Sequence, residues 1–332
     1  MSAIDVIPGS GPAKPQASWR SNMPYLIRTY GIILTFVLLV IVVASGNQAF
    51  LSYQNVLNMS SQWAPVGIMA VGMTFVILTG GFDLSIAATF SLSAVVAAYV
   101  GQTEPPLVAF AMATLAGLAC GLMNGLLVAF VRVNPFIATV GSGFIITGVA
   151  LVLTQNAAFI VSDEAFGILG AGSWNGVPYS GMLLIAFFLV FGFVLRRTVY
   201  GEAIYAVGGG YEASRLSGIR VRGVVASAYV LLGGCVGVAG CITASQLNSA
   251  QANLDPNVIF DVLTIVVVGG TSLSGGVGAM WRTVVGLGII ATISNGFILL
   301  DISPYYQSII KGAIIVAALA LDTVLTRLVR KL

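Results

Sequence analysis

Charged side chains are scarce in this sequence, and histidine is absent. Only 8% of the 332 residues are Asp, Glu, Lys or Arg, and there are 0 histidines. Without histidine, His-based general-base catalysis, His-bearing triads and most zinc sites are excluded. A soluble domain carries about a quarter charged residues. This chain therefore cannot cover a water-facing surface, and we expect an integral membrane protein.

Cysteine is equally rare, and no nucleotide-binding motif is present. Cys120, Cys235 and Cys241 lie inside apolar runs without metal-ligand spacing, so we expect no metal site and no disulfide framework. The run Gly-x-x-x-x-Gly-Lys-Ser/Thr is missing, and with it a phosphate-cradling loop. A formal net charge of +3 does not indicate a nucleic-acid partner. We expect the chain itself to bind no cofactor.

What the sequence does contain is apolar runs long enough to cross a bilayer core of about 30 Å. Hydrophobic residues make up 58% of the chain, and its mean hydropathy is +1.01. The predicted fold class is an all-α integral membrane protein with about ten transmembrane helices in one domain, 28–326. The ranges are 28–46, 63–79, 84–102, 107–131, 136–154, 178–195, 223–244, 257–270, 279–299 and 305–325.

Three of these runs need comment. The run 28–46 is longer than a signal-peptide core of about 7–15 residues, so we expect an uncleaved first span behind a mobile cytoplasmic tail, 1–27. The runs 63–79 and 257–270 are short, and each stops at a Gly-Gly pair. Broken or partly inserted helices are tolerated where the protein encloses them, and we expect such helices here.

Orientation follows from the distribution of Lys and Arg in the loops. Cations gather in the N-terminal tail, in the central loop 196–222 and in the C-terminal segment 327–332. The loops 47–62 and 155–177 contain none. With ten spans, all three basic segments fall on the same side, so both termini are predicted to be cytoplasmic.

Two glycine patterns accompany the runs. Gly117, Gly121 and Gly125 recur every four residues, as do Gly233 and Gly237, which predicts a close helix crossing; a face lining a solute path is the alternative. The segment Gly80–Ser85 also resembles Gly269–Ser274, and both follow a β-branched apolar run. Six positions do not establish an internal repeat.

A few polar residues lie in or beside the runs. Asp83 has two interpretations, a cap on the next helix or a contact with solute. Mid-span Asn124 and Asn295 predict hydrogen bonds between helices, with pore lining second. Lys311 suits snorkelling or pairing with a carboxylate such as Asp261. The candidates for a translocation path are Asp83, Ser85, Asn124, Asn295 and Thr271.

The central loop, 196–222, is the longest predicted cytoplasmic connection. It reads as one or two short helices separated by the Gly208-Gly209-Gly210 run and stopped at Gly218. A solvated amphipathic connector is one interpretation. The other is a docking element, because short helices commonly fit a groove in a partner.

These stretches together resemble the permease subunits of bacterial ABC importers for ribose, xylose, arabinose and autoinducer-2. The likeness covers about 50–325 and is carried by Met69–Ser85, Asn124-Gly125, Phe136–Thr139, Gly201–Gly208, Arg215–Ile219, Val268–Gly276 with Gly278, Tyr305–Gln307 and Lys311. Position 210 departs from the family, where asparagine is common, and we attach no functional weight to that glycine.

The resemblance implies a bacterial inner-membrane location and the other subunits of the transporter. Two permease subunits, identical or related, form the path through the lipid, and a periplasmic binding protein delivers the solute. Two ATPase subunits carry ATP and Mg²⁺ and dock on the segment Glu202–Ile219. In the docking segment, Glu212 and Arg215 lie on the docking surface, and Gly208 and Gly218 set its turns. The docking candidates are Gly201, Glu202, Gly208, Glu212, Ala213, Arg215 and Gly218.

Two rival functions follow from the sequence. A self-contained ion-coupled transporter needs ion ligands at broken helices, and the Gly-Gly breaks keep it open. An intramembrane enzyme or a receptor is disfavoured, because histidine, paired aspartates within spans and a nucleophile motif are all missing.

Overall fold

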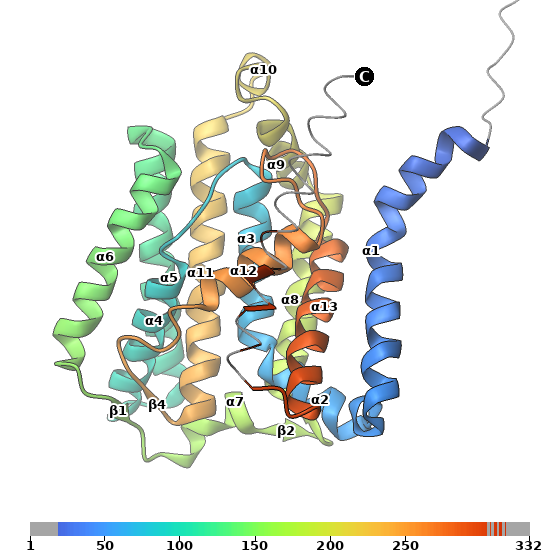
Figure 1. Cartoon of the computed structure of the whole chain (residues 1–332). Coiled ribbons are helices and arrows are strands. Elements are labelled where there is room, and N and C mark those ends of the chain that lie inside the picture. Colours follow the sequence, from blue (N-terminus) through green and yellow to red (C-terminus); the bar gives the residue numbers. More distant parts are fainter. Residues whose placement is uncertain (1–18, 304–305, 307–308, 311, 314–315, 317–332) are drawn as a thin grey trace, which may run out of the picture.

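The structure of the chain is a computed structural model that describes residues 19–303, 306, 309–310, 312–313 and 316. Within these residues the chain is almost entirely helical (Figure 1). The α-helices are α1(Trp19–Gly46), α2(Tyr53–Gln62), α3(Ala64–Leu78), α4(Ile86–Gly101), α5(Pro106–Leu126), α6(Pro135–Thr154), α7(Ile168–Ala171), α8(Tyr179–Arg197), α9(Val199–Gly209), α10(Tyr211–Leu216), α11(Val221–Leu247), α12(Val258–Val268) and α13(Met280–Leu299).

Shorter elements complete the order. Two 3-10 helices, η1(Gln48–Leu51) and η3(Glu164–Gly167), and a π-helical turn, η2(Leu127–Val131), lie between the α-helices. Four two-residue strands form two antiparallel pairs, β1(Phe159–Ile160) with β4(Ser249–Ala250) and β2(Ser173–Trp174) with β3(Val177–Pro178). These strands were not predicted from the sequence.

The helix positions predicted from apolar runs are confirmed up to residue 299. Each predicted range there coincides with a helix, although α1 begins at Trp19 and so extends into the segment expected as a tail. Proline opens α5 and α6, where a missing amide costs nothing, and the Asn134 side chain accepts the amide of Phe136 at the start of α6. Residues 1–18, Lys311 and the segment 327–332 lie outside the described residues, as does most of the predicted range 305–325.

Five described helices are long and apolar enough to cross a membrane: α5 with η2, α6, α8, α11 and α13. A sixth candidate is the pair α2 and α3, bent by 53°. The helices α4 and α12 and the part of α1 from Gly31 to Gly46 are apolar but shorter. The number ten therefore stays a prediction.

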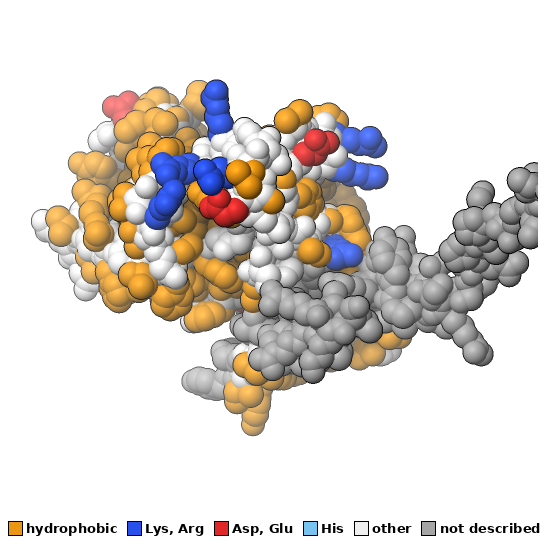
Figure 2. Space-filling view, turned by 90° about the horizontal axis from the view of Figure 1, so that it is seen from above, with side chains coloured by type: hydrophobic (Ala, Val, Ile, Leu, Met, Phe, Trp, Pro, Cys, Tyr) orange, Lys and Arg blue, Asp and Glu red, His pale blue; other side chains and the backbone are white. Residues whose placement is uncertain are grey.

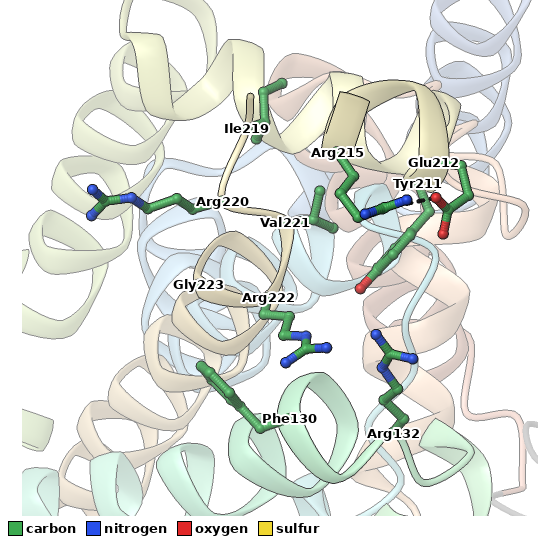
Figure 3. Close-up of a pocket in the computed structure, with 10 residues that line it drawn as sticks. All are labelled: Phe130, Arg132, Tyr211, Glu212, Arg215, Ile219, Arg220, Val221, Arg222 and Gly223. Atoms are coloured by element: carbon green, nitrogen blue, oxygen red, sulfur yellow. Dashed lines mark hydrogen bonds and ion pairs between the residues drawn. The ribbon is translucent and has the colours of Figure 1, made fainter. Parts of the chain in front are cut away.

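The bundle has two distinct ends (Figure 1). One end carries α9 and α10, and Figure 3 places Arg132, Arg215, Arg220 and Arg222 there; we call it the arginine end. The opposite end carries α2, α7 and the two strand pairs, and we call it the strand end. The segment 47–62, expected as a loop, is mostly helical because Ser52 caps α2 by accepting the amide of Asn55.

Helices α3 and α11 form the centre of the bundle. Nearly every residue of α3 is buried, and α11 packs against α3, α4 and α5. The outer helices α6 and α8 instead expose large apolar side chains such as Phe144, Val152 and Leu189. Apolar residues both inside and outside the bundle are what a lipid-facing protein requires. The three cysteines, Cys120, Cys235 and Cys241, are free and buried.

The predicted glycine crossing joins α5 to α11. A Cβ atom added at Gly117 would overlap the carbonyl oxygen of Gly233 and lie 2.8 Å from Cα of Gly237. A Cβ atom at Gly233 would lie 2.9 Å from Cα of Gly121. The two backbones therefore touch directly, which confirms the interpretation as a close crossing.

An irregular segment leads from α11 into α12. After β4 the chain runs into the bundle, where Ala252 is buried and the amide of Leu254 donates to Oγ of Ser91 in α4 at 3.3 Å. The helix α12 that follows is only 11 residues long. Irregular backbone at this depth is tolerated because protein encloses it.

Candidate functional site

The predicted docking element forms as two helices, as the sequence indicated. The Thr198 hydroxyl accepts the amide of Gly201 and caps α9, and the extended residue Gly210 separates α9 from α10. The second helix ends at Leu216, and Gly218 two residues later has a φ of +85°, in the left-handed region that glycine tolerates. The amide of Ile219 then donates to the carbonyl of Ser214, which closes the turn.

The docking candidates divide into an exposed and a packed set. Gly201 is buried, and a Cβ atom there would overlap the carbonyl oxygen of Leu195, so α9 folds back tightly onto α8. The exposed members are Glu202, Glu212, Ala213, Arg215 and Gly218. Figure 2 shows Lys and Arg side chains gathered on this face, with few acidic side chains among them.

One ion pair lies on the exposed set. Nε of Arg215 donates to the Glu212 carboxylate at 2.9 Å, three residues apart on α10. The two side chains are 59% and 69% exposed. Ion pairs this exposed add little to folding, so both groups are accessible to a partner.

Gly208 has a different role from the turn that the resemblance implied. It lies within α9, and a Cβ atom there would overlap the carbonyl oxygen of Leu78 at the end of α3 and the amide nitrogen of Gly276. That amide itself donates to the Leu78 carbonyl at 2.9 Å. We call this meeting point of α9, α3 and the α12–α13 connection the glycine junction, defined by Leu78, Gly208 and Gly276.

A side-chain bond reinforces the glycine junction. The Tyr205 hydroxyl donates to the carbonyl of Gly278 at 2.9 Å, so α9 is attached to the α12–α13 connection at two points. No residue in the sequence pattern pointed to this contact, because it joins three segments that are far apart in the chain.

The short sequence echo corresponds to a shared helix ending. Both α3 and α12 stop at a left-handed glycine, Gly80 with φ +80° and Gly270 with φ +86°. In each case the next amide reaches back five residues, from Gly81 to Val76 and from Thr271 to Val266. The left-handed residue is the first glycine of one pair and the second of the other, so the sequence alignment was shifted by one position.

Three of the path candidates form a buried polar network. The Asp83 carboxylate accepts from the amide and hydroxyl of Ser85 at 2.8 and 2.6 Å, and from Nδ2 of Asn124 at 3.1 Å. Nδ2 of Asn124 also donates to the Ser85 hydroxyl at 2.8 Å. All three residues are at most 4% exposed. The predicted interhelical role of Asn124 is therefore confirmed.

The network also answers the capping prediction for Asp83. Helix α4 has Ser85 as its N-cap, and Asp83 accepts the amide of that N-cap rather than an amide of the first turn. Its segment is held from two further helices, because the Leu84 amide donates to Thr139 of α6 and the Tyr229 hydroxyl of α11 donates to the Phe82 carbonyl.

The other two path candidates lie apart from this network. Asn295 of α13 exchanges two amide hydrogen bonds with Asn55 of α2, at 2.9 and 3.1 Å, which confirms its interhelical role. Thr271 is 1% exposed, and its hydroxyl has no hydrogen-bond partner among the described residues. Asn55 was missed by sequence reasoning because it fell in a segment expected to be a loop.

Two adjoining cavities lie at the arginine end, about 710 and 370 Å³ in volume. They share Arg132, Tyr211, Glu212 and Arg222, and Figure 3 shows the larger one. None of the five path candidates lines either cavity.

Within the described residues, no group of three or more His, Cys, Asp or Glu side chains could hold a metal ion.

Comparison with known proteins agrees with the predicted resemblance. Residues 55–319 match the family described as branched-chain amino acid transport system / permease component. The ribose import permease protein RbsC of Bacillus subtilis (strain 168) is 37% identical over 306 residues, 91% of this chain and 95% of the relative. Its counterpart in Escherichia coli (strain K12) is 38% identical over 295 residues, 87% and 92% of the two chains.

A third relative carries a different sugar in its name. The L-arabinose transport system permease protein AraH of Escherichia coli (strain K12) is 33% identical over 314 residues, 94% of this chain and 95% of that protein. No solved structure matches the chain. The apolar helices and these near full-length likenesses lead to one conclusion: the chain is a membrane protein that belongs to the family of transport-system permease components.

Proposed function

We propose that this chain is the membrane-spanning subunit of an ATP-driven importer for a sugar or sugar-like solute. The observation that carries the proposal is the near full-length likeness to permeases named for ribose import and for L-arabinose transport. The energy source is a separate ATPase subunit that binds ATP and Mg²⁺, and a periplasmic solute-binding protein supplies the sugar. A second permease, either a copy of this chain or a related one, completes the path.

We infer that the ATPase docks on the exposed face of α9 and α10. The supports are the exposed pair Glu212 and Arg215, the exposed Glu202, and the attachment of α9 to α3 through the glycine junction. An ATPase that moves α9 then also moves the end of α3 at Leu78 and the α12–α13 connection at Gly276. Such a motion drives import only if nucleotide stabilises one arrangement over the other.

The buried polar residues take an indirect part in the path in this proposal. Asp83, Ser85 and Asn124 bond to each other and not to an open cavity, so they fix the relative positions of α4 and α5. Asn295 does the same for α13 and α2. Solute would then move along other faces of these helices, between the two permease subunits.

Transport should require the ATPase, and charge reversal on α10 should uncouple it. We expect the permease, reconstituted in sealed vesicles with a candidate ATPase and receptor from its own genome, to take up ribose or L-arabinose only with ATP. Glu212→Arg and Arg215→Glu should each reduce co-purification of the ATPase at least tenfold, because the partner's charges then face like charges. Uptake and pull-down are measured on the same preparations.

The double variant Glu212→Arg/Arg215→Glu is the matched control. It restores the ion pair within α10 but presents reversed charges to the partner, so it should still fail to retain the ATPase. Recovery of ATPase binding in the double variant would assign the pair a structural role instead. Uptake by the permease alone, driven by an ion gradient, would overturn the importer and favour a secondary transporter.

We further propose ten spans with both termini in the cytoplasm and the arginine end on the cytoplasmic side. A reporter that works only in the cytoplasm should be active when it is fused after Gly210 and inactive when it is fused near Asn175. A reporter that works only outside the cytoplasm should give the opposite result. The support is that Gly210 lies at the arginine end, whereas Asn175 lies between the strands β2 and β3 at the strand end (Figure 1). The reverse pattern of reporter activity contradicts this orientation.

A further inference from the structure

The larger cavity at the arginine end is strongly basic. It has a volume of about 710 Å³, and its lining includes four arginines and one acidic residue, Glu212. Figure 3 shows Arg132 and Arg222 reaching toward the same space from opposite sides. The arginines of the lining are Arg132, Arg215, Arg220 and Arg222.

Most of this positive charge is not neutralised by the residues that the structure describes. The single ion pair formed by the described residues joins Arg215 to Glu212. Arg132, Arg220 and Arg222 therefore leave three positive charges at the cavity without a carboxylate partner in this part of the chain. Guanidinium groups bind phosphate oxygens in a fork geometry, which makes phosphate the expected counter-charge.

Main-chain donors add to the same site. Helix α11 begins at Val221, and its N-cap residue, Arg220, makes no capping hydrogen bond through its side chain. The amides of Arg222 and Gly223 have no acceptor among the described residues, and both residues line the cavity. The start of a long helix attracts anions through such free amides and the helix dipole.

Arg132 occupies an unusual backbone position. It follows the π-helical turn η2 with φ +65°, in the left-handed region where glycine or asparagine is ordinary. This conformation costs more for arginine than for glycine, and the Arg132 side chain lines the cavity.

The cavity borders an exposed apolar surface. Phe130, in its lining, is 50% exposed, and Val131 beside Arg132 is 65% exposed. Just beyond Arg132, at the start of α6, Phe136 and Ile137 are 60% and 66% exposed. A soluble anion would leave these apolar side chains exposed, whereas the acyl chains of a lipid would cover them.

We propose that Arg132 and Arg222 bind the phosphate of an anionic phospholipid whose acyl chains lie against Phe130 and Ile137. Basic pockets beside transmembrane helices are a recurrent form of such sites. This proposal requires only that the chain spans a membrane, and its test uses the permease without the ATPase. Failure of the lipid site therefore leaves the docking proposal untouched.

The test compares lipid binding by the full-length wild-type chain and by Arg132→Gln/Arg222→Gln in mixed micelles. The probes are fluorescent phosphatidylglycerol and fluorescent phosphatidylcholine. The double variant should bind phosphatidylglycerol about 25-fold more weakly, roughly fivefold per arginine lost, and phosphatidylcholine unchanged. Arg132→Lys/Arg222→Lys should retain most of the affinity, which separates loss of charge from misfolding.

Arg197→Gln is the matched control, because Arg197 is an exposed arginine at the end of α8 that does not line the cavity. It should bind phosphatidylglycerol as the wild type does. The proposal is overturned if the double Gln variant stays within twofold of the wild type. It is equally overturned if inorganic phosphate displaces phosphatidylglycerol at similar concentration.

Discussion

Gly208→Ala is expected to reduce ATP-driven uptake at least tenfold. The added methyl group would overlap the Leu78 carbonyl oxygen and the Gly276 amide nitrogen, and neither atom is at the end of a flexible side chain. The hydrogen bond between those two groups, 2.9 Å long, would have to stretch or break. Overpacking of this kind costs about 1–3 kcal/mol, and here it separates α9 from α3.

The neighbouring residue supplies the control for this experiment. A Cβ atom at Gly209 meets nothing within 4 Å, so Gly209→Ala should transport at the wild-type rate. Both variants keep the exposed pair of α10, so both should still retain the ATPase in a pull-down. Wild-type uptake by Gly208→Ala would show that the glycine junction does not transmit motion to α3.

Gly117→Val should destabilise the folded chain more than any exposed substitution. Its Cβ atom would overlap the Gly233 carbonyl oxygen, and α11 on the other side is almost fixed by its contacts with α3 and α4. We expect the free energy of unfolding to fall by about 3 kcal/mol, the upper end for overpacking, because the obstacle is main chain. Denaturant titration in detergent, followed by circular dichroism, measures the change.

Gly148→Val is the comparison for that measurement. Gly148 lies in α6, another apolar helix, and a Cβ atom there meets nothing within 4 Å. The same chemical change in open space should shift the unfolding free energy by less than about 0.5 kcal/mol. If Gly117→Val also lowers the free energy of unfolding by less than about 0.5 kcal/mol, the α5–α11 crossing can widen without penalty.

The sequence predicted features that depend on local patterns. Apolar runs identified the apolar helices up to residue 299 but missed α2 and α7, the glycine spacing indicated a close helix crossing, and Gly218 marked the turn after α10. Each of these features follows from the periodicity of residues or from the backbone freedom of one glycine. Both signals are visible in the amino-acid sequence without knowledge of the fold.

Features that depend on long-range partners were not predicted. The acceptor role of Asp83 toward Ser85 and Asn124 requires knowing which helix faces α4. The pairing of Asn55 with Asn295 joins residues 240 positions apart. The basic cavity was missed for the same reason, because Arg132 and Arg222 belong to separate predicted loops and only the fold brings them together.

The main-chain contact between Leu78 and Gly276 also determines which positions of the chain can accept substitutions during evolution. Two side chains in contact can change size together, one growing as the other shrinks, but no substitution shortens a carbonyl or an amide. At Gly208 there is consequently one acceptable residue. The outward positions of α9 and α10 have no such limit, so adaptation to a new ATPase can proceed there while the geometry behind them stays the same.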